Sequence, residues 1–430
     1  MKSACQTASP ARERIAALFD EGTFTETDGF AGKGVITGWG QVEGGLVYAF
    51  SQDLSAMGGA VDRAHARKIE KVYELAVKNG APVVMILDSN GAKVSEGPEI
   101  LQSYQRILSL SNNLSGVVPQ VAVVAGSCVG IGAMMAASAD FVIMAEDAEL
   151  CLTVGADGSA KTCAENGVAH LCCEDAAAAV KKARELITML PLNNLSVVPV
   201  SVEGAPSGKT VSTELSQAEL AEAVCDAGSV IELKAAFADH VYTALASIGG
   251  STVGIVAVKG ELCSKCAGKA AAFVRFCDSF SLPVVSFVDA EGFAGCTCPC
   301  AAAKLSAAYA DATTAKITVY TGSAIGAASV AFGNADLRVA WPGAVISALA
   351  PASAVEFFRH DDLKGAADLA ARRSELAEEY ADTEASPFAA AKAGMVEDIV
   401  APAATRDLLI SALESLASKR VSRLPKKHSC

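Results

Sequence analysis

The chain has 430 residues, of which 51% are apolar, so it can bury a large core and is long enough for two or three domains. Asp and Glu number 48 against 35 Lys and Arg, which gives a net charge of −13. This excess of negative charge repels a nucleic-acid backbone, so we expect no nucleic acid among the partners.

The first residues, from Met1 to Phe19, lack the basic stretch followed by an apolar stretch that marks a secretory signal. We therefore expect a cytoplasmic protein. Disulfides rarely persist in that compartment, so the 14 cysteines are expected to be free thiols.

Alternating strands and helices are predicted from near the N-terminus onward. Residues 46–50, 83–87 and 121–124 are runs of apolar and β-branched residues, which predict buried strands. Residues 63–78, between the first two runs, carry apolar side chains at helical spacing. Strands separated by helices predict an α/β fold.

Residues 121–139 contain no charged side chain. A helix of this length could cross a membrane. The stretch contains three Gly, two Ser and several Ala, a composition that suits a buried strand followed by a tightly packed helix. We favour the second interpretation.

Several segments of the first half return in the second half at nearly constant spacing. Residues 82–91, with the sequence PVVMILDSNG, match residues 283–292, PVVSFVDAEG. Residues 126–130, GSCVG, match residues 322–326, GSAIG. Ordered matches of this kind indicate a tandem duplication.

The two copies define the predicted domains. Residues 202–209, VEGAPSGK, are rich in Gly, Pro and Ser and are predicted to link the copies. The domains are therefore expected at residues 1–208 and 209–430. After about Ala370 the pattern turns helical, and the basic residues 426–430 predict a solvated tail.

In each copy an apolar strand ends in a turn of small residues and continues into an Ala-rich helix. Glycine lets a ligand approach the backbone, and the amides at the start of a helix can bind an anion. Each turn is therefore a candidate oxyanion site. Neither turn has the Lys of a nucleotide P-loop, and Gly130-Ile-Gly132 is too short a match to a Rossmann fingerprint. Close packing of helix on sheet remains the alternative.

A set of short motifs accompanies these turns. They are FSQD at 50–53, MGG at 57–59, HARKI at 65–69, DSNGAK at 88–93, EG at 96–97, SGVVPQ at 115–120, NGVAH at 166–170 and AWP at 340–342. From about Arg14 to about Ala412, the chain resembles the carboxyltransferase subunits of biotin-dependent acyl-CoA carboxylases and of sodium-pumping acyl-CoA decarboxylases.

The resemblance implies a tandem duplication of two crotonase-like (ClpP/crotonase) domains, each a mixed sheet spiral flanked by helices. The first half is expected to hold the acyl-CoA thioester, with the amides of Gly130 and Ile131 on the thioester oxygen. The second half is expected to hold biotin, with the amides of Gly326 and Ala327 on the ureido oxygen. The remaining binding residues that the resemblance implies are Gly58, Gly59, Asn90, Gly91, Ala92 and Val330.

The resemblance also implies partners. Biotin would arrive on a separate biotin carboxyl carrier protein, because the chain has no biotinylation tract. Further subunits would be a biotin carboxylase or a membrane decarboxylase complex, to which this subunit could be attached. The chain is expected to form a homo-oligomer with each active site between halves of different subunits.

The chain departs from the family pattern at four places. One is the pair Gly322 and Ser323, where family members often carry Arg-Lys. The turns read Gly130-Ile-Gly132 and Gly326-Ala-Ala328 where the family usually has Gly-Gly-Ala, and the segment between Leu152 and Cys163 is shorter. That segment helps to wall the acyl pocket in the family, so the sequence leaves the acyl group open.

Two alternative functions remain. A non-catalytic scaffold could descend from a carboxyltransferase and explain the altered turns. An enoyl-CoA hydratase or isomerase would share the fold, but hydration needs carboxylates over the thioester, and residues 134–138, MMAAS, have none.

The cysteines cluster at one place, with Cys263 and Cys266 followed by Cys296, Cys298 and Cys300. Four such thiolates could hold zinc or an iron–sulfur cluster. A zinc ribbon would more typically show two CxxC pairs, and CxCPC is not one. We predict a metal-free cluster.

Overall fold

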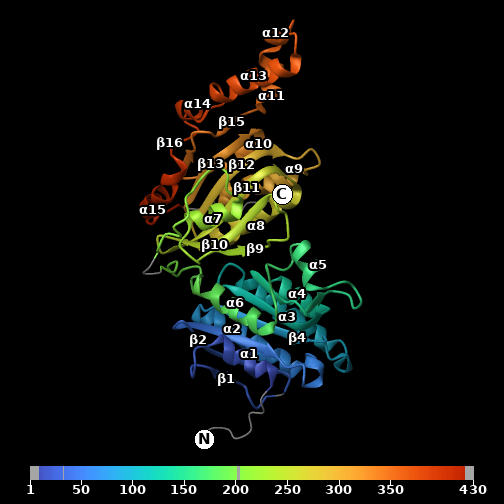
Figure 1. The fold of residues 1–430 in the computed structure, drawn as a ribbon. Coiled ribbons are helices and arrows are strands. Elements are labelled where there is room, and N and C mark those ends of the chain that lie inside the picture. The colour runs from blue at the N-terminus through green and yellow to red at the C-terminus, as the bar shows by residue number, and fades with distance from the viewer. Residues whose placement is uncertain (1–8, 32, 201–203, 422–430) are drawn as a thin grey trace. The chain divides into compact units, whose positions relative to one another are not determined.

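The computed structural model describes residues 9–31, 33–200 and 204–421. Contacts divide the chain into two compact units (Figure 1). The first unit comprises residues up to Pro199 together with Lys234–Phe237, and the second comprises Val200–Leu233 and the chain from Ala238 onward.

The first unit is built on an eight-stranded sheet. Its strands are β1 (Thr25–Thr27), β2 (Val35–Val42), β3 (Gly45–Gln52), β4 (Val83–Ser89), β5 (Gln120–Val129), β6 (Phe141–Ala145), β7 (Glu149–Cys151) and β8 (Leu171–Cys173). They lie in the order β1-β2-β3-β4-β5-β6-β8, with β7 paired to β5. The β1–β2 and β2–β3 pairs are antiparallel, and the pairs from β3 onward are parallel.

The second unit repeats this sheet. Its strands are β9 (Ile231–Leu233), β10 (Val241–Ile248), β11 (Ser251–Leu262), β12 (Val284–Phe293), β13 (Lys316–Ile325), β14 (Leu337–Ala340), β15 (Val345–Ser347) and β16 (Asp398–Ile399). The order is β9-β10-β11-β12-β13-β14-β16, with β15 paired to β13. The first two pairs are again antiparallel and the others parallel. The predicted α/β fold and its duplication are confirmed.

Helices connect the parallel strands in both units, and further helices precede or follow each sheet along the chain. In the first unit these are α1 (Pro10–Leu18), α2 (Arg63–Asn79), α3 (Glu99–Leu114), α4 (Ile131–Ala137), α5 (Ala160–Glu165) and α6 (Ala176–Thr188), with short 3-10 turns η1 (Met57–Gly59) and η2 (Val94–Glu96). In the second they are α7 (Gln217–Val224), α8 (Ser264–Ser279), α9 (Pro299–Asp311), α10 (Gly326–Phe332), α11 (Pro351–Phe358), α12 (His360–Leu363), α13 (Leu369–Asp382), α14 (Pro387–Lys392) and α15 (Thr405–Leu416), with η3 (Pro402–Ala404).

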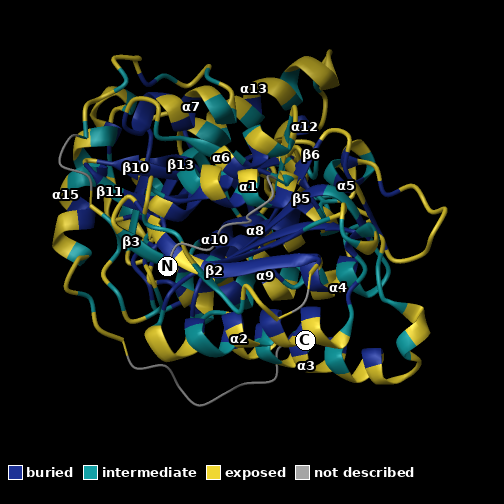
Figure 2. Cartoon of the chain, turned by 90° about the horizontal axis from the view of Figure 1, so that it is seen from below, coloured by how far each residue is buried: buried dark blue, intermediate teal, exposed yellow. Residues whose placement is uncertain are grey.

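The sequence explains where α2 begins and ends. Asp62 caps its first turn by accepting the His65 amide, and Gly80 ends it in the left-handed conformation at φ 60°. Its buried face, including Ile69 and Tyr73, packs into the core of the first unit. Figure 2 shows that the strands of both sheets are mostly buried, as parallel strands covered by helices must be.

The uncharged stretch 121–139 forms β5 and then α4. No helix within the described residues is long and apolar enough to cross a membrane. The interpretation as a buried strand followed by a packed helix is confirmed.

The predicted linker packs on the second unit. Pro206 forms an antiparallel bridge with Asp226, and the Gly204 carbonyl accepts a hydrogen bond from Arg406. These contacts explain why the first unit ends at Pro199, before the boundary predicted after residue 208. Val202 and Glu203 lie outside the described residues, as does the basic tail 426–430.

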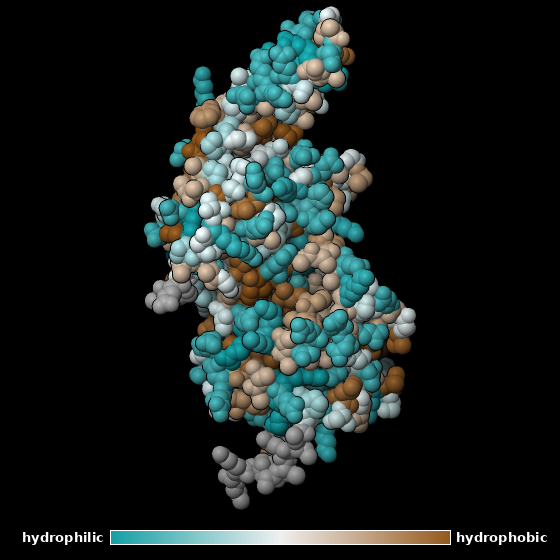
Figure 3. All heavy atoms as spheres, viewed as in Figure 1, coloured by the Kyte–Doolittle hydropathy of each residue, from teal (hydrophilic) through white to brown (hydrophobic). Residues whose placement is uncertain are grey.

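The helical pattern predicted after about Ala370 is present as α13. A small apolar cluster joins this helix to α11 and α12 through Val355, Leu363 and Leu376. The surface of this region is largely hydrophilic in Figure 3.

Candidate functional site

The turn between β5 and α4 depends on Gly130. Its φ of 66° and ψ of −130° belong to a region that side chains rarely allow. A Cβ added there would meet no other atom within 4 Å, so the turn faces open space. The backbone at this position is therefore accessible to a ligand.

The two amides predicted at this turn differ in their hydrogen bonds. The Gly130 N–H donates to the Cys151 carbonyl at 2.9 Å, continuing the pairing of β5 with β7. Ile131 is the first residue of α4, where no carbonyl of the helix can accept its N–H. Ile131 is thus the available donor of the pair, and Gly130 supplies the backbone shape.

The end of β4 lies beside this turn. A Cβ placed on Gly91, whose φ is 104°, would stand 3.7 Å from the Val129 carbonyl oxygen. The Asn90 amide donates to the Gly58 carbonyl at 3.0 Å, and Gly59 lies so close to the β4 backbone that a side chain would overlap it. The structure therefore brings together Gly58, Gly59, Asn90 and Gly91.

Ala92 follows in an isolated parallel bridge with Val61. The Val61 amide donates to the Gly91 carbonyl, and the Lys93 amide donates to the Val61 carbonyl, each at 2.9 Å. Backbone groups alternate in direction along such a pairing, so the Ala92 N–H points away from Val61. It is a second backbone donor near the first turn.

A buried carboxylate lies against the strand that leads into this turn. Asp88 forms an ion pair with Arg14 at 2.8 Å, and its Oδ1 lies where a side chain on Gly126 would have to sit. In the second unit, Asp289 takes the same place against Gly322. These aspartates were not among the site residues predicted from the sequence, although both stand within the repeated segment.

The second turn, between β13 and α10, has related geometry. Gly326 has a φ of 57°, and a Cβ there would stand 3.2 Å from the Ala348 carbonyl oxygen. Ala327 is exposed, and the Val330 side chain one turn later is 72% exposed. At the matching position of the first unit, Met134 is 50% exposed.

The second unit also repeats the bridge that contains Ala92. Leu262 pairs with Phe293, and the Ala294 amide donates to the Leu262 carbonyl at 3.0 Å. Phe293 is thus the counterpart of Ala92. Phe293 was not among the site residues predicted from the sequence, although the spacing that relates Gly91 to Gly292 also relates Ala92 to Phe293.

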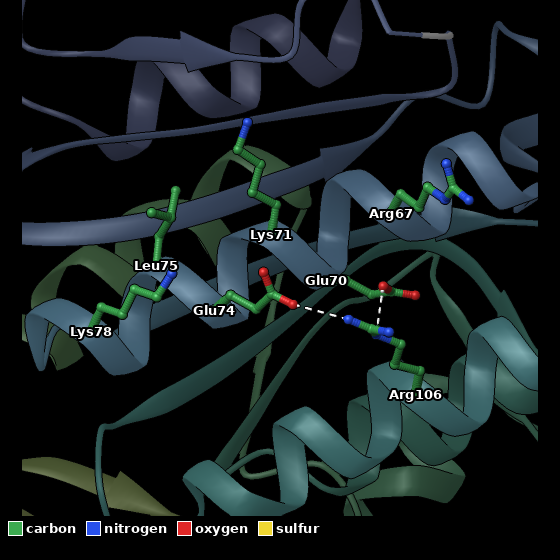
Figure 4. A pocket seen from close by; sticks show the side chains of 7 residues that line it. All are labelled: Arg67, Glu70, Lys71, Glu74, Leu75, Lys78 and Arg106. Carbon is green, nitrogen blue, oxygen red and sulfur yellow. Dashed lines mark hydrogen bonds and ion pairs between the residues drawn. The ribbon is translucent and has the colours of Figure 1, made fainter.

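A separate surface pocket of about 390 Å³ lies between α2 and α3. Figure 4 shows Arg106 of α3 directed toward Glu70 and Glu74 of α2, with which it forms ion pairs at 2.8 and 3.1 Å. None of the predicted site residues lines this pocket, and both of its acidic groups form ion pairs with Arg106.

The cysteine cluster begins with Cys263 and Cys266, whose sulfur atoms are 3.1 Å apart. Cys296, Cys298 and Cys300 are exposed. No group of three or more potential metal ligands is found within the described part of the chain. The metal-free state of the cluster stays a prediction.

The geometry fits anionic oxygens of small ligands. Each unit presents backbone amides at a turn whose shape needs glycine, next to an exposed apolar side chain. Such fixed donors stabilise an oxyanion without reorganisation. A thioester and the ureido ring of biotin each offer one carbonyl oxygen to such donors.

Comparisons with known proteins agree with this geometry. Residues 7–430 match the carboxyl transferase domain. The methylmalonyl-CoA decarboxylase subunit alpha of Veillonella parvula is 34% identical, covering 99% of this chain and 94% of the relative. The propionyl-CoA carboxylase carboxyltransferase subunit of Haloferax mediterranei is 35% identical, covering 97% and 92%.

A solved structure of transcarboxylase 12S, described as a hexamer with hydrolysed methylmalonyl-coenzyme A bound, superimposes with a TM-score of 0.89. It is 33% identical and covers 97% of this chain and 91% of its own. These similarities extend over nearly the whole chain and over both units. The chain therefore belongs to the carboxyl transferase family and is, as the sequence predicted, a biotin-dependent acyl-CoA carboxyltransferase.

Proposed function

We propose that the first unit binds the acyl-CoA thioester at the turn of Gly130 and Ile131, and that the second unit binds biotin at the turn of Gly326 and Ala327. The observation that carries this proposal is the repetition of one strand, turn and helix arrangement in both units. A reaction with two similar anions needs two similar sites.

The chemistry explains why backbone amides suffice. Moving a carboxylate between a biotin nitrogen and the α-carbon of a thioester produces a ureido anion on one side and an enolate on the other. Each anion places charge on an oxygen, where fixed N–H donors lower the barrier. In the first unit these donors are the amides of Ile131 and Ala92.

Hydration is less compatible with this site. A hydratase needs carboxylates above the thioester, and α4 carries no acidic residue. The ionisable group behind the turn, Asp88, is buried and paired with Arg14. Acid–base chemistry on the ligand would need a group on the open side of the turn.

For the substrate we propose a short acyl-CoA of the propionyl or methylmalonyl type. Relatives over nearly the full chain are named for these thioesters, and a transcarboxylase structure contains methylmalonyl-coenzyme A in hydrolysed form. Val330 supplies an exposed apolar side chain four residues after Gly326, and the resemblance to the family implies that this position separates short acyl groups. The other proposed contacts to the thioester are Gly58, Gly59, Asn90 and Gly91.

For the assembly we propose a homo-oligomer that works with a biotin carboxyl carrier protein. The transcarboxylase 12S is described as a hexamer, and several apolar side chains of this chain are exposed, including Phe357 and Phe358. A biotin carboxylase or a membrane decarboxylase would complete the complex. The cytoplasmic location stays a prediction.

The decisive experiment is a carboxyl-transfer assay on the purified full chain with free biotin. The carboxyl donors are malonyl-CoA and methylmalonyl-CoA, and the product is carboxybiotin. Transfer from methylmalonyl-CoA is expected, with sedimentation reporting an oligomer at micromolar concentration. A folded oligomer that transfers carboxylate from neither thioester would be a scaffold, and a monomer would contradict the proposed assembly.

A further inference from the structure

Two cysteines meet at the start of α8. Cys263 occupies the position that caps the helix, and its sulfur accepts a hydrogen bond from the Cys266 amide at 3.4 Å. The two sulfur atoms are 3.1 Å apart, so one thiol also donates to the other. The first unit has Asp62 at the corresponding cap, so this pair is particular to the second unit.

The two thiols differ in access to solvent. Cys263 is partly exposed, whereas Cys266 is 1% exposed. A reagent from solution can therefore reach only the first sulfur directly. The second sulfur can react only with what is already attached to the first.

The pKa values of the two thiols also differ. Although partial burial opposes it, hydrogen bonds from the Cys266 thiol and from the backbone amides of Cys266 and Lys265 lower the pKa of Cys263. Burial raises the pKa of Cys266 to about 11. Cys263 is therefore more often present as the nucleophilic thiolate, whereas Cys266 remains a protonated thiol.

We propose that Cys263 and Cys266 are a redox-active dithiol that exchanges with small-molecule disulfides and closes an intramolecular disulfide bond at the start of α8. The spacing permits this bond, because residues three apart in a first helical turn have Cα atoms roughly 5 to 6 Å apart, within the range of disulfides. The sulfurs need to approach by only about 1 Å.

The exchange proceeds in two balanced steps. The Cys263 thiolate attacks one sulfur of a disulfide RSSR, which forms a mixed disulfide and releases RS⁻. The Cys266 thiol then loses its proton to RS⁻, and its sulfur attacks Cys263 and releases the second RS⁻, which takes up a proton from water. Two cysteines are oxidised, and RSSR is reduced to two RSH.

A third cysteine lies nearby and is the rival partner. Cys298 occupies the N-cap position of α9 without a side-chain capping bond, and its amide donates to the Ser264 hydroxyl at 2.8 Å. The nearby amides of Cys300 and Ala301 lower the pKa of the exposed Cys298. No thiol contact joins it to Cys263 within the described residues, whereas Cys266 is already in hydrogen-bond contact.

The test uses the reduced full chain and oxidised glutathione. Remaining thiols are alkylated and located by peptide mass spectrometry in the wild type and in Cys263→Ser, Cys266→Ser and the matched control Cys296→Ser, which lies in the same exposed segment as Cys298. In a second measurement, limiting iodoacetamide reports the relative reactivity of each thiol.

A Cys263–Cys266 disulfide is expected in the wild type and in Cys296→Ser. Cys266→Ser should stop at a glutathione adduct on Cys263, and Cys263→Ser should leave Cys266 unmodified. Iodoacetamide should label Cys263 about tenfold faster than Cys296. A disulfide from Cys263 to Cys298, or no disulfide and equal labelling of Cys263 and Cys296, would overturn the proposal.

Discussion

The two units have the same backbone plan but support it with different side chains. Both contain the same strand order, a glycine with positive φ at the turn and an aspartate behind it. In the first unit the aspartate is paired with Arg14, while in the second Asp289 accepts the Ser323 amide at 2.7 Å. The duplication has thus kept the arrangement of main-chain donors and allowed the surrounding side chains to diverge.

A second repeated feature keeps the same side chains in both units but differs in burial. In the first unit Asp20 accepts the amides of the β2–β3 turn and pairs with Arg184. In the second, Asp226 accepts the amides of the β10–β11 turn and pairs with Arg406. The second pair is the more buried, with side chains 11% and 6% exposed against 25% and 27%.

The largest expected effect separates the chemical roles of the two turns. Proline has no N–H, so Ile131→Pro should slow exchange at the α-carbon of the acyl-CoA by roughly a hundred- to a thousand-fold. Ala327→Pro should slow carboxyl transfer to or from biotin by a similar factor and leave acyl-CoA binding intact.

Controls for this comparison are Ile131→Ala and Ala327→Ser, which keep the amides. Each variant must retain its oligomeric state and far-UV circular dichroism, because proline can strain the turn. If both folded proline variants lose both partial reactions equally, or lose neither, the division of labour between the units is wrong.

The next effect concerns stability. Arg406→Ala leaves the buried Asp226 without its cation and should destabilise the second unit by about 2 to 3 kcal/mol, whereas Arg184→Ala should destabilise the first unit less. Hydrogen exchange of each sheet measures the units separately. Equal losses of stability in the two units would show that the deeper burial of the Asp226–Arg406 pair does not make it more stabilising than the Asp20–Arg184 pair.

This pair also gives a pH dependence. Burial acts to raise the pKa of Asp226, but hydrogen bonds from Ser247 and Arg406 outweigh it and lower the pKa. A lowered pKa contributes stability that is present above the unfolded value of about 3.9 and is lost as pH falls through the folded value. Without Arg406 the folded pKa of Asp226 should rise. In Arg406→Ala the second unit should therefore lose stability at a higher pH than in the wild type as the solution is acidified.

A smaller effect concerns selectivity. If Val330 contacts the acyl group, Val330→Ala should change the ratio of kcat/KM between propionyl-CoA and acetyl-CoA about tenfold. Met134→Ala, at the matching place of the first unit, should change this ratio less than Val330→Ala does. A ratio that responds to Met134 and not to Val330 would reverse the assignment of the two exposed positions.

The smallest effect involves two aspartates at matching positions. Asp140 and Asp336 each accept an amide at 2.8 Å, from Gln120 and Lys316, but only Asp336 is also paired with Lys419. Burial raises the pKa of Asp140 to about 7. The stability that this group contributes is therefore complete below the unfolded value of about 3.9 and lost as pH rises through about 7.

Asp140→Asn should accordingly stabilise the first unit at pH 8 by roughly 1 kcal/mol, because the residue is partly exposed and the full shift is not realised. Asp336→Asn should give no gain, since it loses the pair with Lys419. Thermal unfolding at pH 5 and pH 8 measures both. A gain for Asp140→Asn that is the same at the two pH values would contradict this explanation.

Much of the fold could be predicted from the sequence because the relevant signals are local. The strand at 83–87, the helix at 63–78 and the glycine turns depend on residues within a few positions of each other, and the structure has them as β4, α2 and the turns at Gly130 and Gly326. The repeats extended these local signals to the whole chain and indicated two copies of one fold.

The hydrogen bonds of the site could not be predicted in the same way. Whether the Gly130 amide is free depends on β7, whose Cys151 carbonyl accepts it. The extent of the predicted linker depends on Asp226 and Arg406, which hold it on the second unit. None of these partners is near in sequence to the group that it contacts.

The sequence by itself determined the α/β class, the duplication, the family and the two glycine turns, because spacing and composition are properties of the chain alone. Only the tertiary structure decided that the Gly130 amide is already bonded, which aspartates lie beside the two turns and which cysteines are in contact. Burial and hydrogen-bond partners are set only when segments distant in sequence pack together. A backbone amide can donate to a ligand only if no carbonyl of another segment already accepts its hydrogen bond.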